Sequence, residues 1–251
     1  MKIGVIGLGL IGGSIFKDLL RLGYNVIAVS KSQRGDRIFD SYEAIKNCAL
    51  VFVCSSMNNT LSILDELENW LPNTTVVTDV SSVKSFVCKK ERPYLFVPSH
   101  PMAGTEKKGF EYSLENLFND ATWVITPFQG ESEILENVIS DLGAKIIKTS
   151  PQKHDEAVAM ISHIPMIISQ AIFKTIKNNE LALKLASSGF RDTTRLAMSN
   201  TEMAQDMLNY NNSNIKDGLS KFSENLSELI NNDYKSQIDL IATQRAKMFR
   251  K

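Results

Sequence analysis

A glycine-rich turn near the N-terminus constrains the fold more than any other feature of this sequence. Residues 7–12 read GLGLIG, a Gly-x-Gly-x-x-Gly motif that follows an apolar run at residues 3–6 and opens a helix-like stretch. In such a unit the first glycine makes a tight turn, and the second lets the backbone approach a pyrophosphate at the helix N-terminus. The motif therefore predicts a dinucleotide-binding strand–turn–helix unit, with a glycine-rich turn that binds no ligand as the alternative.

The chain up to about residue 148 alternates short apolar runs with helix-like stretches, a pattern typical of a doubly wound α/β sheet. The predicted strands cover residues 3–6, 26–29, 50–54, 75–78, 95–97, 122–126 and 145–147. The predicted helices cover residues 12–22, 59–70, 83–89, 114–118 and 132–142. Apolar runs of this length between helices indicate buried strands of a mostly parallel sheet.

The strand signal stops after Ser150, and only helical patterns follow. Ser150 and Pro151 are typical of a helix start, and residues 199–202 read as a capping box. Apolar stripes predict two more helices at residues 211–230 and 233–249. We therefore predict an α/β domain at residues 1–149 and an all-helical domain at residues 150–251. A helical domain of roughly 100 residues is small for a self-sufficient core, so we expect it to pair with a second copy in a homodimer.

The composition argues against several classes of protein. Lys plus Arg and Asp plus Glu both number 28, whereas a dedicated nucleic-acid binder would carry a basic excess. The longest apolar runs are shorter than the ~20 residues that span a bilayer, and glycines follow the N-terminus too soon for a signal peptide. Cys48, Cys54 and Cys88 lack metal-ligand spacing. We therefore expect no metal site, no membrane segment, and free thiols in a cytoplasmic protein.

Hydroxyl groups and cations follow the second predicted strand, where a site for NAD usually has a carboxylate. Residues 30–34 read SKSQR, and the first acid after this strand is Asp36. Such side chains suit the 2′-phosphate of NADP, so we predict that NADP is slightly favoured over NAD. The alternative is an exposed basic loop beside a site that accepts either cofactor. The residues assigned to cofactor binding are Gly7, Leu8, Gly9, Leu10, Ile11, Gly12, Ser30, Lys31, Ser32, Ser55, Ser56 and Ser81.

Two polar segments follow later strands, at the edge where open α/β sheets bind ligands. Residues 78–84 read TDVSSVK, in which Ser82 either contacts a ligand or caps a helix, and both can hold at once. Residues 99–106 read SHPMAGTE. His100 in this second segment is the best-placed general base, because an imidazole exchanges protons near neutral pH. The alternative is a structural histidine in a loop.

The first predicted helix of the second half carries two histidines. His154 and His163 are nine residues apart, which places them on opposite faces of a straight helix and argues against a shared metal ion. Pro165 is expected to kink the helix near His163. His163 is therefore either a satisfied core residue or a ligand contact.

Two arginines four residues apart, Arg191 and Arg195, would share one face of a helix. The guanidinium group is the usual planar clamp for a carboxylate, so either is a candidate for holding an acidic ligand. The alternative is an ion pair inside the domain, such as Arg191 with Asp192.

Five motifs occur in the order seen in the prephenate and arogenate dehydrogenases of tyrosine biosynthesis, and the chain resembles this family over nearly its whole length. They are residues 7–14 (GLGLIGGS), 79–84 (DVSSVK), 100–106 (HPMAGTE), 161–165 (ISHIP) and 187–195 (SSGFRDTTR). The resemblance implies a Rossmann domain followed by a helical dimerisation domain. It also implies an oxidoreductase for a small dicarboxylate, which converts prephenate to 4-hydroxyphenylpyruvate, or arogenate to tyrosine, with hydride transfer to NAD or NADP.

By motif match, the resemblance implies that His100 is the catalytic histidine, that Ser82 is its hydroxyl partner, and that Arg195 anchors the substrate carboxylate. The other residues assigned to the substrate site are Thr105, Glu106, His163 and Arg191. In the implied reaction, His100 accepts a hydrogen bond or proton from the 4-hydroxyl group while hydride leaves C4 of the ring. Loss of carbon dioxide then makes the ring aromatic, so the protein mainly has to position its substrates.

Two segments depart from the family pattern. Met166 stands where some relatives have a second histidine, so the sequence does not support feedback inhibition by tyrosine. Residues 30–49 lack most of the usual helix after the second strand, so we expect an open adenosine side.

Two other functions fit parts of the sequence. A β-hydroxyacid dehydrogenase would carry a catalytic lysine in its helical domain, and a non-catalytic dinucleotide-binding regulator would lack His100 or Arg195. The choice between prephenate and arogenate is left open, since they differ only by a keto or amino group on the side chain.

Overall fold

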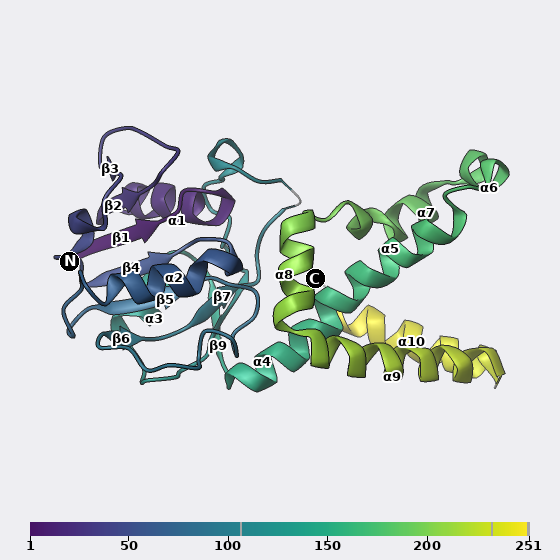
Figure 1. Ribbon diagram of the computed structural model, residues 1–251. Coiled ribbons are helices and arrows are strands. Elements are labelled where there is room, and N and C mark those ends of the chain that lie inside the picture. Colours follow the sequence, from purple (N-terminus) through teal and green to yellow (C-terminus); the bar gives the residue numbers. More distant parts are fainter. Residues whose placement is uncertain (106, 232, 250–251) are drawn as a thin grey trace.

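A six-stranded parallel sheet forms the core of the N-terminal domain in the computed structural model, which describes residues 1–105, 107–231 and 233–249 (Figure 1). The strands in spatial order are β3 (Ile38–Phe39), β2 (Asn25–Val29), β1 (Lys2–Ile6), β4 (Leu50–Val53), β5 (Val76–Asp79) and β6 (Leu95–Phe96). Every neighbouring pair is parallel. The chain leaves β1 and β4 toward opposite edges, and this reversal opens a ligand crevice outside their C-terminal ends.

Helices cover both faces of this sheet, which is why its central strands are apolar throughout. Side chains alternate along β4: the first and third residues pack with α1 (Leu10–Arg21) and α3 (Glu133–Asp141), and the second and fourth pack with α2 (Met57–Leu67). The predicted doubly wound α/β fold is therefore confirmed.

Three further strands form a separate sheet beside β5. They are β7 (Ser99–Pro101), β8 (Thr122–Ile125) and β9 (Lys145–Lys148), with β7 antiparallel to β8 and β8 parallel to β9. The sequence indicated β8 and β9 but not β7, because β7 has only three residues and contains a proline. His100 consequently lies within a strand, opposite Val124, and not in a loop.

Two short helices expected from the sequence are absent, and in both segments backbone N–H groups donate to side chains of distant elements. Residues 83–89 form turns, in which the N–H groups of Lys84 and Ser85 donate to the carboxylate of Asp155. Residues 114–118 are also irregular. There the amide of Asn116 donates to Asp18, and its φ of 58° is not helical. Tertiary hydrogen bonds thus override the local helical pattern at both places.

Helices form the rest of the described chain. They are α4 (Pro151–Val158), the π-helical turn η3 (Ala159–His163), α5 (Ile164–Ile176), α6 (Glu180–Leu185), α7 (Ser188–Thr193), η4 (Arg195–Met198), α8 (Thr201–Tyr210), α9 (Asn212–Asn231) and α10 (Tyr234–Met248). Ser150 caps α4 with its side chain, as predicted. The cap of α8 is the side chain of Asn200, which accepts from the amide of Met203, and not the predicted capping box.

The helical domain meets the sheet domain at α8 and at the start of its long first helix, and two arms project away from this junction (Figure 1). One arm contains α5 to α7, and the other contains α9 and α10. The domain's own buried apolar cluster consists of Ala159, Ile164 and Ile215. Exposed apolar side chains on the arms include Leu181, Leu185, Met198, Ile230, Leu240 and Met248.

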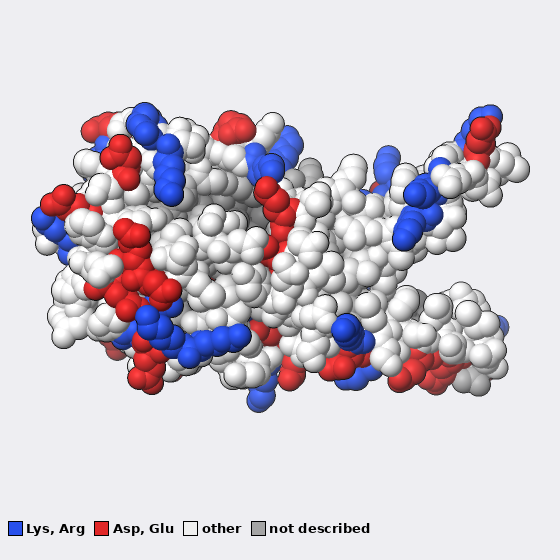
Figure 2. Space-filling view, viewed as in Figure 1, with Lys and Arg blue, Asp and Glu red and all other residues white. Residues whose placement is uncertain are grey.

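Charge and hydropathy vary along the molecule. On the face shown in Figure 2, acidic and basic side chains are interspersed, as the zero net charge would suggest. By length and composition alone, the helical stretch 151–176 could cross a membrane, although no single apolar run in the sequence indicated it. This stretch contains His154, Asp155 and His163, whose buried polar groups bond to other parts of the chain.

Candidate active site

A hydrogen-bonded chain of three side chains joins the two domains beside the end of β5. Nδ1 of His100, on β7, lies 3.0 Å from Nε2 of His154, on α4. Nδ1 of His154 lies 2.8 Å from Oδ1 of Asp155. His154 and Asp155 are buried, whereas His100 is partly exposed. We call these three residues the His–Asp chain.

The carboxylate of Asp155 is held by backbone amides of the turn that follows β5. The N–H groups of Lys84 and Ser85 each donate to it at 2.7 Å, one to each oxygen. Burial raises the pKa of Asp155, but hydrogen bonds from His154 and from these amides outweigh burial and hold the pKa below its usual value. Asp155 is therefore ionised at neutral pH.

The side chain of Lys84 is fully buried and has a structural role in this turn. Its Nζ donates to Oδ2 of Asp79 at 2.5 Å and to the carbonyl of Ser99 at 2.7 Å. This ion pair joins the end of β5 to the strand that carries His100. Lys84 therefore helps to hold β7 in place.

His100 is suited to act as a base at neutral pH. Burial lowers the pKa of its imidazole well below the usual value, and the neighbouring His154, Lys84 and His163 lower it further. The ring is therefore neutral at pH 7 and retains one lone pair for a proton.

His163 is also buried and neutral. Its Nδ1 lies 3.3 Å from the amide nitrogen of Asn211, which also donates to the backbone carbonyl of Asp155. Burial lowers the pKa of His163 to about 4, despite the opposing charge of Asp155. Its Nε2 has no hydrogen-bond partner among the described residues. The prediction that His154 and His163 lie on opposite helix faces assumed a straight α-helix. The π-helical turn η3, which ends at His163, breaks the regular α-helical spacing between them, so that prediction does not apply.

A cavity of about 770 Å³ opens at the ends of β1 and β2, beside the glycine-rich turn. It is lined by seven of the residues assigned to the cofactor, namely Gly7, Leu8, Gly9, Ser30, Lys31, Ser32 and Ser55. Leu10, Ile11 and Gly12 lie in the first turn of α1, and Ser56 is the N-cap residue of α2. Ser81 is buried and lies within hydrogen-bond distance of Thr60.

The three glycines have distinct roles that fit a dinucleotide. Gly7 has a φ of 87°, and a Cβ there would lie 2.5 Å from the carbonyl oxygen of Cys54. A Cβ on Gly12 would lie 1.9 Å from the carbonyl oxygen of Gly7. Nothing lies within 4 Å of a Cβ on Gly9, which precedes α1 without a side-chain cap. Gly9 therefore leaves open the space that a pyrophosphate at this helix N-terminus needs.

We expect the variants Gly9→Ala and Gly12→Ala to separate cofactor binding from stability. Gly9→Ala costs about 0.5 kcal/mol of stability, as alanine is a poor N-cap, but weakens NAD(P) binding roughly tenfold or more because its methyl group occupies the pyrophosphate space. Gly12→Ala lowers the melting temperature instead. Thermal unfolding without cofactor and cofactor titration by intrinsic fluorescence measure the two effects. Unchanged cofactor affinity in Gly9→Ala would remove the glycine-rich turn from the binding site.

The loop after β2 uses much of its polar character internally. The hydroxyl oxygen of Ser30 accepts from the amides of Ser32 and Gln33. Nη1 of Arg34 donates to the carbonyls of Ser30, Lys31 and Gln33, so Arg34 bonds to its own loop. Residues 30–49 contain only β3 and one 3₁₀ turn, so the usual helix after the second strand is missing, as the sequence predicted.

A carboxylate that sequence reasoning missed lines the same cavity. β3 pairs in parallel with β2, and Asp40 follows β3 directly, so it reaches the cavity that also contains Ser30 and Lys31. In the sequence, only the apolar pair Ile38 and Phe39 before Asp40 points to this strand, and two residues are too few to indicate one. The surroundings of the loop after β2 are therefore less basic than the sequence of that loop suggested.

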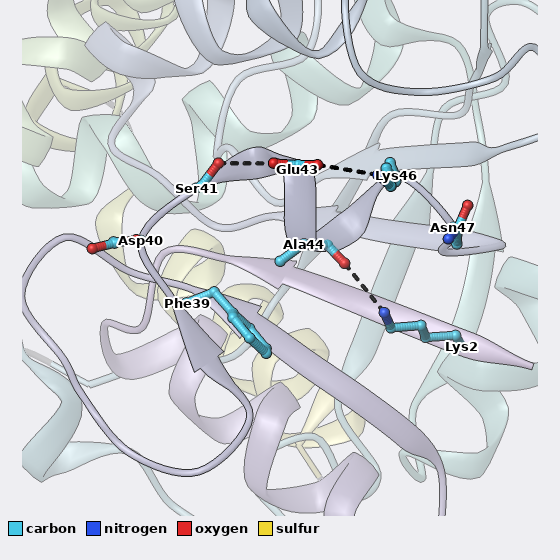
Figure 3. A pocket seen from close by; sticks show the side chains of 8 residues that line it. All are labelled: Lys2, Phe39, Asp40, Ser41, Glu43, Ala44, Lys46 and Asn47. Carbon is cyan, nitrogen blue, oxygen red and sulfur yellow. Dashed lines mark hydrogen bonds and ion pairs between the residues drawn. The ribbon is translucent and has the colours of Figure 1, made fainter.

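A second, open cavity of about 460 Å³ lies around the same segment, between Lys2 and Asn47 (Figure 3). Among its charged groups, Lys46 pairs with Glu43, and Lys2 donates to the carbonyl of Ala44. It shares Asp40 with the larger cavity but contains none of the predicted catalytic residues.

The other predicted site residues are not joined to the His–Asp chain. Ser82 is half-buried, and its hydroxyl group donates to Sδ of Met57 at 3.5 Å. Its expected bond to His100 is not present, and the ring bonds to His154 instead. Thr105 is exposed and accepts from the amide of Lys107. Glu106 lies outside the described residues.

The two arginines lie in the arm that contains α7 and η4. Nε of Arg191 donates to Oδ1 of Asp192 at 3.1 Å, which is the alternative that the sequence left open. Arg195 is exposed at the start of η4 and forms no ion pair with the described residues. Among residues 1–105, 107–231 and 233–249, no group of His, Cys, Asp or Glu is placed to hold a metal ion.

The family model "Prephenate dehydrogenase, nucleotide-binding domain" matches residues 26–148, and "Prephenate dehydrogenase, dimerization domain" matches residues 150–242. A prephenate dehydrogenase of Bacillus subtilis is 32% identical over 250 residues, which cover 89% of this chain and 67% of that protein.

Two solved structures share the whole fold. The Synechocystis arogenate dehydrogenase superposes with a TM-score of 0.83 at 34% identity, covering 98% of both chains. The A. aeolicus prephenate dehydrogenase, solved with hydroxyphenyl propionate and NAD+, has a TM-score of 0.88 at 25% identity and covers 99% of this chain and 98% of that one.

Proposed function

The chain belongs to the prephenate dehydrogenase family, and on that premise we propose that it oxidatively decarboxylates prephenate or arogenate with an NAD(P) cofactor. The observation that carries the proposal is the neutral, partly exposed imidazole of His100, which is held on β7 by its bond to His154. The family assigns the reaction type, and this imidazole provides the base that the reaction needs.

The residues of this chain have three tasks in the proposed reaction. His100 accepts the hydrogen bond or proton of the substrate's 4-hydroxyl group as hydride leaves C4, and Arg195 holds a substrate carboxylate. The bound cofactor supplies the hydride acceptor. The C–H bond at C4 breaks as a ketone forms, and the ring carboxylate then leaves as carbon dioxide. Its bonding electrons pass through the ring to the ketone oxygen, which takes back a proton, and the ring becomes an aromatic phenol. Catalysis thus depends on orientation of one base and one anchored carboxylate.

The direct test follows the absorbance of reduced nicotinamide with purified protein, prephenate or arogenate, and NAD or NADP. Turnover of at least one substrate with one cofactor is expected, and the ratio of kcat/KM values decides the substrate. A folded protein that binds NAD(P) but turns over neither substrate would contradict the proposal and favour a non-catalytic regulator.

We propose a preference for NADP with NAD retained. Lys31 and the hydroxyl groups of Ser30 and Ser32 suit a 2′-phosphate, whereas the nearby carboxylate of Asp40 opposes it. Exposed ion pairs contribute only ~0–1 kcal/mol each, so the preference is modest and falls as salt rises.

Two substitutions should shift this preference in opposite directions. Ser30→Asp keeps an oxygen for the loop amides but adds a charge that repels the 2′-phosphate, so it shifts the kcat/KM ratio toward NAD by about tenfold. Asp40→Asn removes a negative charge and raises the preference for NADP several-fold. Steady-state kinetics with both cofactors at low salt measure the ratios. A clear preference of the unmodified enzyme for NAD would show that Lys31 is only a solvated surface charge.

We also propose that the helical domain forms a homodimer. The arms expose many apolar side chains, and the domain buries a small apolar cluster of its own, so a second copy is the expected cover. The family model that matches this half is named a dimerization domain. Sedimentation velocity at micromolar concentration is expected to give the mass of two chains, and a stable monomer would contradict this assembly without affecting the chemistry.

A further inference from the structure

We propose that His154 and Asp155 are positioning residues that hold His100 in the tautomer with its proton on Nδ1, leaving the lone pair of Nε2 for the substrate hydroxyl. This inference deepens the proposed function and rests on it, because it identifies the atom of His100 that acts as the base.

The direction of the chain is set at its Asp155 end. An ionised carboxylate only accepts hydrogen bonds, and the oxygens of Asp155 already accept from two backbone amides. The third bond, to Nδ1 of His154, must therefore be donated by the histidine. A neutral imidazole that donates from Nδ1 has its lone pair on Nε2.

The tautomer of His154 in turn sets the direction of its hydrogen bond to His100 across the domain junction. Nε2 of His154, now an acceptor, lies 3.0 Å from Nδ1 of His100, so Nδ1 of His100 carries the proton. The lone pair of His100 is then on Nε2. That atom forms no hydrogen bond with a described residue and is not among the buried unpartnered atoms of the described chain, so a ligand can reach it.

The opposite tautomer of His100, with its proton on Nε2, would prevent the proposed reaction. If His154 carried protons on both nitrogens, Nδ1 of His100 would accept, and the proton of a neutral His100 would lie on Nε2, where the substrate needs a lone pair. The charged and titratable groups that act on His100 are His154 on α4, Lys84 in the turn after β5, and His163 in η3. The buried ammonium group of Lys84 is paired with Asp79 and forms no bond with the ring.

The His–Asp chain draws its residues from both domains. His100 lies on β7 of the sheet domain, and His154 and Asp155 lie on α4 of the helical domain. Docking of α4 onto the turn after β5 is therefore required to set the tautomer of His100. When His100 accepts the substrate proton at Nε2, its Nδ1–H can still donate to His154, so the developing cation keeps its partner.

The protein has only three histidines, which makes a direct test possible. Nitrogen-15 NMR of the full chain with labelled histidine distinguishes a protonated ring nitrogen from one with a lone pair, and single variants assign the three rings. We expect His100 to be protonated at Nδ1 and bare at Nε2 at neutral pH. A proton on Nε2 of His100, or a doubly protonated His154, would overturn the proposal.

Variants test whether His154 imposes this state. His154→Phe keeps a planar ring without nitrogens, so His100 should populate both tautomers, and kcat should fall about 10–100-fold, as for other orienting partners, with cofactor affinity unchanged. His154→Gln, whose amide oxygen can accept from Nδ1 of His100, should keep the tautomer and more of the activity. His163→Gln is the matched control for the NMR measurement alone, because it removes the other buried histidine and should leave the tautomer of His100 unchanged.

Two results would count against the role of His154: an unchanged His100 tautomer in folded His154→Phe, or a kcat equal to that of the unmodified enzyme. If His154→Phe does not fold, Asp155→Asn tests the same chain, since an amide no longer dictates which nitrogen of His154 carries the proton. The NMR measurement requires no substrate. Absence of turnover would therefore contradict the proposed function, whereas a wrong tautomer in an active enzyme would contradict only this inference.

Discussion

Replacing His100 with asparagine is expected to lower kcat by roughly 100-fold or more, because the reaction loses the group that accepts the proton of the substrate hydroxyl. The asparagine amide can still donate to Nε2 of His154, so the interior bond that holds β7 against α4 has a substitute. Cofactor affinity should stay nearly unchanged, since the glycine-rich turn and the loop after β2 are not altered. Single-turnover kinetics and a cofactor titration measure the two quantities.

The pH dependence of the unmodified enzyme provides an independent check on this base. The pKa of His100 lies well below its usual value, so the neutral ring is already present at pH 6.5. With respect to this group, kcat/KM should be flat from pH 8 down to about 6.5 and should fall only at lower pH, when the ring becomes protonated.

Near-normal turnover in the His100→Asn variant would remove His100 from the mechanism.

Substitution of Arg195 by alanine is expected to weaken substrate binding by about 2 kcal/mol, or roughly 30-fold in KM, with a smaller effect on kcat. This value lies at the low end for a charged anchor, because the guanidinium group is exposed in the free chain and is covered only when substrate binds. Arg195→Lys keeps the charge but loses the two-pronged geometry, so it should give an intermediate KM.

The matched control for Arg195 is Lys184→Ala, which removes another exposed cation from the same arm. Its KM should stay within about twofold of the unmodified enzyme, since exposed charges that do not touch the substrate act weakly. Equal effects of Lys184→Ala and Arg195→Ala would mean that only the general charge of the arm matters and that Arg195 is not a specific anchor.

Local patterns were sufficient to predict the main architecture. The glycine-rich turn after β1, the alternation of strands and helices, and the cap at Ser150 each depend on neighbouring residues, and the structure confirms them. The predicted position of the glycine-rich turn also follows from the sequence, because the C-terminal ends of parallel strands meet at one edge of a sheet. The family resemblance rests on motifs of the same local kind.

Contacts between distant segments decided the features that the sequence did not reveal. Asp155 binds the backbone amides of Lys84 and Ser85 in a turn where the sequence predicted a helix, and its neighbour His154 contacts His100. Asp40 reaches the cofactor cavity only because a two-residue strand pairs with β2. In each case a short segment forms hydrogen bonds with a segment far away in the sequence, and the periodicity of the sequence does not record such contacts.

The sequence by itself therefore determined the fold class, the dinucleotide turn and the identity of the candidate base, since each is written in residues that are neighbours along the chain or repeat at a regular period. The tertiary structure alone decided that Nδ1 of His100 bonds to His154, that Asp40 lines the cavity beside the glycine-rich turn, and that Arg191 but not Arg195 has an ion pair among the described residues. The physical reason is that hydrogen-bond direction and ion pairing depend on where two remote backbones meet.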